Sequence, residues 1–136
     1  MPDIPWFTPT QAAPDAEVYV MASRFETATL TGALRFFLKS PGIIRQTRKA
    51  PGAHGVALRA RVFSRTFLTL SAWEDRDALY RFARSEPHRS GARAAARYMK
   101  ESTFTFWTVP AAGLPIGWAE AERRLGEERQ KEEPGR

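Results

Sequence analysis

Apolar and polar residues alternate along the first predicted strand, at residues 17–26 (EVYVMASRFE). Alternation with Val and aromatic side chains is typical of a half-buried strand. The apolar residues that follow repeat with the spacing of one helix face, so a helix is predicted next, with Thr27 or Thr29 able to cap its first turn. These apolar residues are Leu30, Ala33, Leu34, Phe37 and Leu38. The Ser-Pro-Gly segment at 40–42 is expected to interrupt this helix, with Ser40 capping a further turn that reaches residue 49.

The rest of the pattern completes a small α+β fold. The elements predicted after residue 50 are strands at 54–62 and 66–73, a helix at 76–84, a helix from about 88 to 99, and a strand at 102–109. Asp75 or Glu74 can cap the helix at 76–84, and Pro87 separates the two helices. The order β-α-β-β-α-β predicts a ferredoxin-like domain, with a four-stranded antiparallel sheet and the helices on one face.

The two ends of the chain differ from this body, which we place at residues 17–118. Residues 1–16 form a Pro-rich N-terminal arm that cannot be a regular helix or a central strand. We expect Trp6 and Phe7 to pin this arm to the body. Residues 119–136 form a charged C-terminal tail, which we expect to be partly disordered or a frayed helix end.

A sheet with helices on one face leaves the other face bare. In the strand at 66–73, Leu68, Leu70 and Ala72 share one face, and the opposite face carries Phe67 and Trp73. Both faces are therefore partly apolar, and the bare one should be buried against something. A second copy of the chain is the simplest partner, so we predict a homodimer built as a dimeric α+β barrel.

The composition of the chain excludes several kinds of chemistry but says little about the fold. The 136 residues include no Cys and two His, which excludes disulfides, Cys nucleophiles, zinc–thiolate sites and multi-histidine metal sites. The net charge of +6 comes mainly from Arg spread along the chain rather than packed into a basic tract, so we do not expect nucleic-acid binding. No apolar run is long enough for a membrane span and the first residues lack a signal-peptide pattern, so we expect a cytoplasmic protein without a membrane partner.

Several segments resemble the antibiotic biosynthesis monooxygenase-like domains of the dimeric α+β barrel superfamily, over about residues 17–109. They are 51–56 (PGAHGV), 70–75 (LSAWED), 85–89 (SEPHR) and the aromatic strand at 104–107 (FTFW). The Pro-rich arm and residues 114–118 (LPIGW) suggest a bacterial subgroup of this fold.

The resemblance implies a homodimer with one ligand pocket per protomer, between sheet and helices. In some members that pocket holds an aromatic polyketide-like phenol, which molecular oxygen oxidises without a cofactor. The function implied here is a monooxygenase-like enzyme acting on an aromatic or polyketide-type metabolite. The alternative is a non-catalytic dimeric binding protein for a hydrophobic metabolite or haem. In the haem-degrading relatives the iron-binding His would fall near Ala92, so the resemblance supplies no haem ligand.

Two residues are the main candidates for chemistry. His88 can act as the catalytic base that a phenol needs before it reacts with oxygen, or it can simply cap a helix or face solvent. Trp73 ends its strand, where its indole offers a flat wall and one hydrogen-bond donor to a substrate, or it can be a core residue. The second histidine, His54, lies in a turn beside Gly55 and is expected to be structural.

Further substrate-binding candidates come from the strands. Phe67, Phe104 and Phe106 add aromatic surface that can line a pocket or fill the dimer core. Arg24 and Arg59 can pair with a carboxylate or phenolate if their face lines the cavity, or they can lie on a solvated strand face. We expect no metal site and no cofactor.

Overall fold

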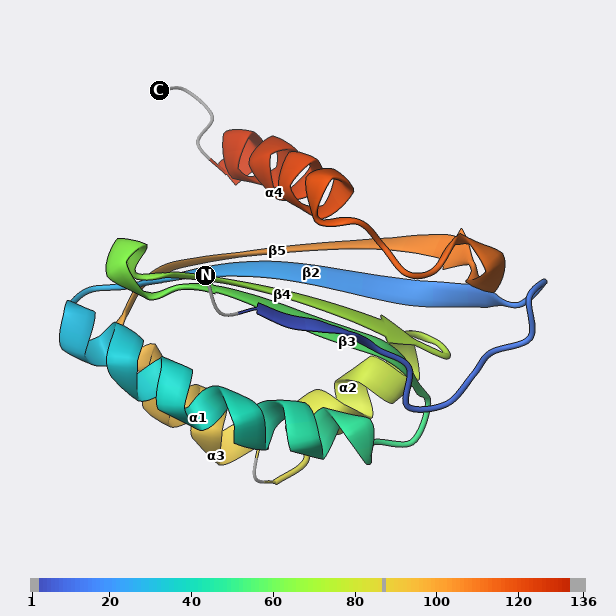
Figure 1. Cartoon of the computed structure of the whole chain (residues 1–136), viewed down its shortest axis with the longest axis horizontal. Coiled ribbons are helices and arrows are strands. Elements are labelled where there is room, and N and C mark those ends of the chain that lie inside the picture. The colour runs from blue at the N-terminus through green and yellow to red at the C-terminus, as the bar shows by residue number, and fades with distance from the viewer. Residues whose placement is uncertain (1–2, 87, 133–136) are drawn as a thin grey trace.

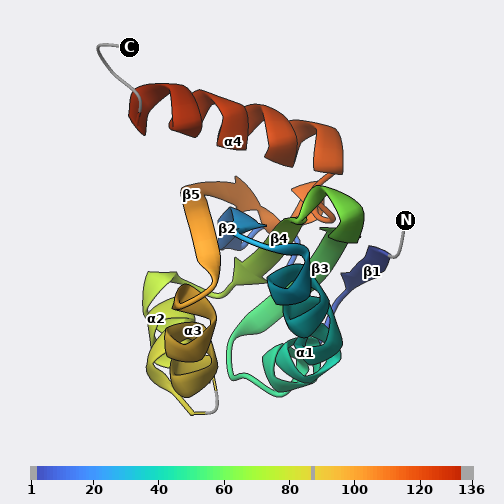
Figure 2. The same ribbon diagram turned by 90° about the vertical axis from the view of Figure 1, so that its left-hand side faces the viewer.

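The computed structural model describes residues 3–86 and 88–132, and Figures 1 and 2 show its layers from two directions. The strands are β1 (Asp3–Phe7), β2 (Glu17–Thr27), β3 (Ala53–Arg61), β4 (Thr66–Trp73) and β5 (Met99–Pro110). The helices are α1 (Leu30–Arg48), α2 (Arg76–Arg84), α3 (His88–Ala96) and α4 (Trp118–Glu132). From β2 to β5 the chain follows the predicted order, and the α+β fold with an antiparallel sheet is confirmed.

The sheet has five strands rather than the four expected, in the order β1-β3-β4-β2-β5. The N-terminal arm supplies the extra strand, because β1 pairs antiparallel with β3 at the edge of the sheet. Pro5 fits there since an edge strand needs hydrogen bonds on only one side. The Trp6 ring lies over Gly55, where a Cβ atom would overlap it. Trp6 therefore holds the arm against the sheet, while Phe7 packs under the Arg48 guanidinium, 4.1 Å from the ring centroid.

Helix α1 runs through Pro41 without a break, so the interruption predicted at 40–42 is wrong. Of the two possible caps, Thr29 is the one used, and its hydroxyl accepts a hydrogen bond from the Gly32 N–H at 3.0 Å. Ser40 lies inside the helix and donates to the Phe36 carbonyl at 2.9 Å. That bond satisfies the hydroxyl within the helix, so Ser40 can be buried against the sheet.

The buried face of α1 also differs from the predicted one. Its buried residues are Gly32, Ala33, Phe36, Ser40, Ile44 and Thr47. Leu30, Leu34 and Leu38 instead form an exposed ridge along the outside of the helix, and Leu38 is 77% exposed. Of the predicted residues, Ala33 is buried and Phe37 is partly buried, whereas the three leucines face outward because Phe36, Ser40 and Ile44 occupy the contact with the sheet.

Helix α4 covers the face of the sheet opposite to α1, α2 and α3, as Figures 1 and 2 show. The expectation of a bare sheet face is therefore wrong. Ala121 and Leu125, one turn apart on α4, are buried there with Ile116 from the preceding segment. The sheet side of this contact consists of Val18, Val20, Ala22, Ala57, Leu68, Leu70 and Ala72.

The segment expected to be a charged tail thus forms a helix as far as Glu132, and residues 133–136 lie outside the described residues. Its charges flank the buried residues and pair with the sheet. Glu122 contacts both Arg59 and Arg61, and Arg129 contacts Glu101 on β5. The apolar contacts of this mostly polar helix come from Ala121, Leu125 and the partly buried Trp118. In the part of the chain that the structure describes, no helix is long and apolar enough to cross a membrane.

Candidate functional site

The end of β4 places Trp73 beneath α2, on the sheet face that α1, α2 and α3 cover. The side chain is 1% exposed and lies between Tyr19 on β2 and Ala53 on β3, its partners across the sheet. Asp75 caps α2 by accepting a hydrogen bond from the Ala78 N–H at 2.8 Å. The chain therefore turns directly from strand to helix and folds α2 back over the Trp73 ring.

Four buried polar groups have no hydrogen-bond partner among the described residues: the Tyr98 hydroxyl, the Trp107 indole N–H and two groups on β4. The two on β4 are the Trp73 indole N–H and the Ser71 hydroxyl. Because strand residues two apart share a face, both groups lie along the same side of β4. Ser23 and Thr69, next to them on β2 and β4, hydrogen-bond to each other and are satisfied. Unpaired buried donors are uncommon in proteins, and they mark the place where a ligand oxygen could be bound.

Aromatic rings extend from these donors in one direction. The centroid of Phe82 on α2 lies 5.1 Å from that of Trp73, and the centroid of His88 lies 4.7 Å from that of Phe82. On the neighbouring strands Tyr19 and Phe106 stack with a centroid separation of 5.8 Å. Phe106 is 42% exposed, so this aromatic surface continues to the outside of the molecule.

His88 begins α3, and its Nδ1 atom lies 3.3 Å from the carbonyl oxygen of Ala83. A carbonyl can only accept a hydrogen bond, so this contact places a proton on Nδ1, and a neutral imidazole held in this way has its lone pair on Nε2. This is the form a general base requires. The imidazole is partly exposed and packs against Phe82, so a ligand could reach it.

Tyr19 adds a phenol at the same end of the sheet. Burial raises the pKa of Tyr19, the neighbouring Tyr80 raises it further, and Arg76 lowers it by a smaller amount. Arg76 is held nearby, with its guanidinium 4.9 Å from the centroid of the Tyr80 ring. Tyr19 is therefore a neutral hydroxyl at ordinary pH and remains able to donate a hydrogen bond.

The structure brings together some of the residues proposed from sequence and separates others. His88 and Trp73 both contact Phe82, and Phe106 lies on the adjacent strand pair. Phe104 packs edge-on against Phe25, with ring centroids 5.5 Å apart, and is 42% exposed.

Three predicted residues lie away from this group. Phe67 is fully buried and packs on Phe36 of α1, with ring centroids 4.6 Å apart. Arg24 and Arg59 face α4 on the opposite side of the sheet, where Arg24 pairs with Glu101 and Arg59 with Glu122. His54 contacts the Thr10 carbonyl through Nδ1 at 2.7 Å and so ties the N-terminal arm to β3.

Sequence reasoning did not single out Ser71 or Phe82 as site residues. The signal for Ser71 was present, since strand alternation puts it on the same face as Trp73. The contacts of Phe82 with Trp73 and His88 depend on where α2 crosses the sheet, which the sequence pattern does not describe. Within residues 3–86 and 88–132, no group of three or more His, Asp or Glu side chains is arranged to hold a metal ion.

Comparison with known families gives one match over most of the chain. Residues 26–133 match the model of a family described as "Domain of unknown function (DUF3291)". No curated protein matches the sequence.

Solved structures with a similar fold include the following three. A putative antibiotic biosynthesis monooxygenase from Nitrosomonas europaea has a TM-score of 0.62 at 15% identity, covering 74% of this chain and 94% of that one. SnoaB, a cofactor-independent oxygenase from Streptomyces nogalater, has a TM-score of 0.54 at 19% identity, covering 69% and 94%. A conserved protein from Methanosarcina mazei has a TM-score of 0.61 at 14% identity, covering 69% and 94%. The resemblance to antibiotic biosynthesis monooxygenase-like proteins is thus confirmed for the fold, and over a quarter of this chain lies outside what it shares with SnoaB.

Proposed function

The chain belongs to the DUF3291 family, and we propose that it is a monooxygenase-like enzyme that binds a flat aromatic metabolite between β4 and α2. The observation that carries this proposal is the pair of buried, unpaired donors on β4, the Trp73 indole N–H and the Ser71 hydroxyl. A phenol or ketone oxygen would accept hydrogen bonds from them and remove the cost of leaving them unsatisfied. The fold shared with SnoaB, a cofactor-independent oxygenase, adds support for the reaction class.

The shape of the ligand follows from the order of the rings. The Phe82 ring contacts both the Trp73 ring and the His88 imidazole, with centroid separations of 5.1 Å and 4.7 Å. A molecule that reaches both the β4 donors and His88 has to extend along the Phe82 ring. Such a span favours a flat molecule of several fused rings, since stacking on aromatic side chains is best for planar ligands. In this arrangement Tyr19 and Phe106 contact the second face or the outer edge of the molecule.

The proposed reaction is oxidation of a ring methylene beside a phenol, as in a hydroxyanthrone. His88 Nε2 removes a proton, and the resulting carbanion, delocalised as a phenolate, reacts with molecular oxygen. The β4 donors stabilise the charge on the oxygen atom. One atom of oxygen becomes the new carbonyl oxygen of the quinone and the other leaves as water. The methylene carbon loses four electrons and dioxygen gains four, so no cofactor is needed.

Oxygen uptake with 1,8-dihydroxyanthrone as the probe tests this proposal. We expect His88→Gln to lower kcat by about 100- to 10,000-fold, the usual contribution of a general base. The matched control is His54→Gln, which changes the other histidine in the chain, at the N-terminal arm, and should leave kcat within about twofold. Equal rates for His88→Gln and the wild type would reject His88 as the base. No oxygen uptake by the wild type with a panel of polycyclic phenols would reject the reaction class.

We also propose that the protein acts as a homodimer, as the resemblance implies. The surface for this dimer has to differ from the one first expected, because α4 occupies the open face of the sheet. The exposed ridge of Leu30, Leu34 and Leu38 on α1 is the apolar surface best suited to the contact. Light scattering coupled to size-exclusion chromatography should give a dimer for the wild type and a monomer for Leu34→Glu. A monomeric wild type would reject the dimer.

A further inference from the structure

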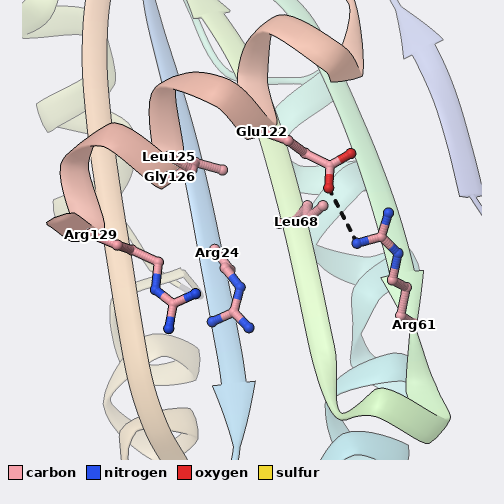
Figure 3. Close-up of a pocket in the computed structure, with 7 residues that line it drawn as sticks. All are labelled: Arg24, Arg61, Leu68, Glu122, Leu125, Gly126 and Arg129. Atoms are coloured by element: carbon pink, nitrogen blue, oxygen red, sulfur yellow. Dashed lines mark hydrogen bonds and ion pairs between the residues drawn. The ribbon is translucent and has the colours of Figure 1, made fainter.

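A pocket lies between the C-terminal half of α4 and the sheet, on the side of the sheet away from Trp73 and His88. Its volume is about 190 Å³. The sheet contributes Arg24, Arg61 and Leu68, and α4 contributes Glu122, Leu125, Gly126 and Arg129. In Figure 3 the guanidinium groups of Arg24 and Arg129 lie side by side, with Arg61 and Glu122 paired across from them.

Positive charge is in excess around this pocket. Three guanidinium groups line it, against the single carboxylate of Glu122. Glu101 lies beside the pocket, and its Oε1 accepts from both Arg24 at 3.2 Å and Arg129 at 2.8 Å. Glu122 is likewise shared, between Arg61 and a second arginine on β3. Arg24 also pairs with Glu26, 3.4 Å away. Four guanidinium groups around the pocket therefore share three carboxylates, and the remaining positive charge attracts an anion.

Gly126 supplies a second, independent observation. Glycine in the interior of a helix destabilises it relative to alanine. Here it follows Leu125 at the point where α4 crosses the pocket, and a Cβ added to it would meet nothing within 4 Å. The missing side chain therefore leaves the pocket open on the helix side. Any larger residue at this position would project into the space between Leu125 and Arg129.

We propose that this pocket binds a small organic carboxylate. The carboxylate group would lie on the pocket side of Arg24 and Arg129 and accept from the guanidinium N–H groups that do not donate to Glu101. The apolar body would contact Leu68 and Leu125, which form the non-polar part of the lining. Drug-sized ligands occupy pockets of about 300–1,000 Å³, so this smaller volume suits an acid with a single ring or a short chain. The apolar lining favours such an acid over inorganic phosphate.

Isothermal titration of the full chain at pH 7 tests the proposal with four probes. They are benzoate and hexanoate as carboxylates, benzyl alcohol as the neutral counterpart of benzoate, and inorganic phosphate. We expect one of the two carboxylates to bind saturably at one site per chain, at least about tenfold more tightly than benzyl alcohol or phosphate. We also expect affinity to fall as salt is added, because the contacts are between charges.

Two variants locate the site and one serves as a matched control. Arg129→Gln removes one guanidinium group and is expected to weaken carboxylate binding at least about tenfold. Gly126→Leu keeps every charge but fills the pocket, and it should abolish binding. Arg123→Gln makes the same charge change on the same helix, at an exposed residue that pairs with Glu127, and should leave binding unchanged. His88→Gln should also bind normally, which separates this site from the proposed active site.

Three results would overturn the proposal. One is that neither carboxylate binds the wild-type chain. Another is that benzyl alcohol binds as well as benzoate, which would mean that the arginines contribute nothing. The last is a variant result that places the acid outside this pocket. Carboxylate binding that survives Gly126→Leu would be such a result, and so would equal weakening by Arg123→Gln and Arg129→Gln. Circular dichroism of each variant checks that α4 remains folded.

Discussion

Replacing Ser71 with alanine gives the sharpest test of the two unpaired donors. The side chain is 6% exposed, and its hydroxyl makes no hydrogen bond to any described residue. Burying a hydroxyl without a partner costs about 1–3 kcal/mol in proteins. Ser71→Ala removes that cost, and it leaves almost no cavity because only one oxygen atom is lost. We therefore expect the variant to be about 1 kcal/mol more stable than the wild type, which corresponds to roughly 3 °C in Tm for a domain of this size.

Ser23→Ala is the matched comparison, because it makes the same change on the adjacent strand. Ser23 is also buried, but its hydroxyl is hydrogen-bonded to that of Thr69. Removing it leaves Thr69 without this partner, so we expect a loss of about 1 kcal/mol. The two variants should thus shift stability in opposite directions although they remove the same group from the same face of the sheet.

Urea unfolding followed by tryptophan fluorescence measures both changes. Ser71→Ala should also lower kcat/KM for the aromatic probe by about tenfold, since the lost hydroxyl is a proposed contact to the ligand oxygen. A Ser71→Ala variant less stable than the wild type by 1 kcal/mol or more would mean that the hydroxyl is satisfied in the folded protein. The proposed binding site would then lose one of the two unpaired donors on which it rests.

Three further predictions concern the fold. Leu125→Ala should lower the free energy of unfolding by about 2–5 kcal/mol, because this side chain of α4 is 2% exposed against the sheet. Leu38→Ala, on the exposed ridge of α1, should leave the free energy of unfolding almost unchanged. Equal effects of the two variants in urea unfolding would contradict the packing of α4 on the sheet. Burial alone would raise the pKa of Glu26, but hydrogen bonds and charges from Lys100 and Arg24 outweigh it and hold the pKa below its ordinary value of 4.5. Glu26 therefore stabilises the fold above that pH and loses its contribution as pH falls through the lowered pKa, so Glu26→Gln should be less stable than the wild type at pH 7 and equally stable in strong acid. Gly55→Ala should displace Trp6 and release β1, seen as faster proteolysis of the N-terminal arm, and an unchanged cleavage rate would mean that the Trp6 ring does not hold the arm.

The central part of the fold could be predicted from sequence because its strands alternate cleanly. The opposite faces assigned to Leu70 and Trp73 are those found in the structure. The helix caps were also readable, since Thr29 and Asp75 are polar residues placed just before apolar repeats. These features depend on residues that are close together in the sequence, so a single sequence is enough to predict them.

The packing partners of each element could not be predicted in the same way. On α1 the prediction of Ala33 as a buried residue was right, but Leu34 and Leu38 were wrongly placed inward, because Phe36 and the internally bonded Ser40 take the positions against the sheet. A charged helix such as α4 gives almost no hydrophobic signal when only residues such as Leu125 are buried. These outcomes depend on the shape of the opposing surface, which composition and periodicity do not describe.

At the candidate site, too, the residue types could be predicted from the sequence, but their packing partners could not. His88 and Trp73 were singled out by residue type, and in the structure both rings contact Phe82. Arg24 and Arg59 were grouped with them as ligand contacts, yet they face α4. Strand alternation separates two faces but does not say which of them lies against which helix.

The most direct test of the proposed reaction is the fate of labelled oxygen. The wild-type protein, freed of metals by chelation, is incubated with 1,8-dihydroxyanthrone under ¹⁸O₂, and the quinone is analysed by mass spectrometry. The account predicts one ¹⁸O atom per quinone, formed at a rate that falls by about 100-fold or more in His88→Gln. Quinone that carries no label, or that forms equally fast with the His88 variant, would contradict it.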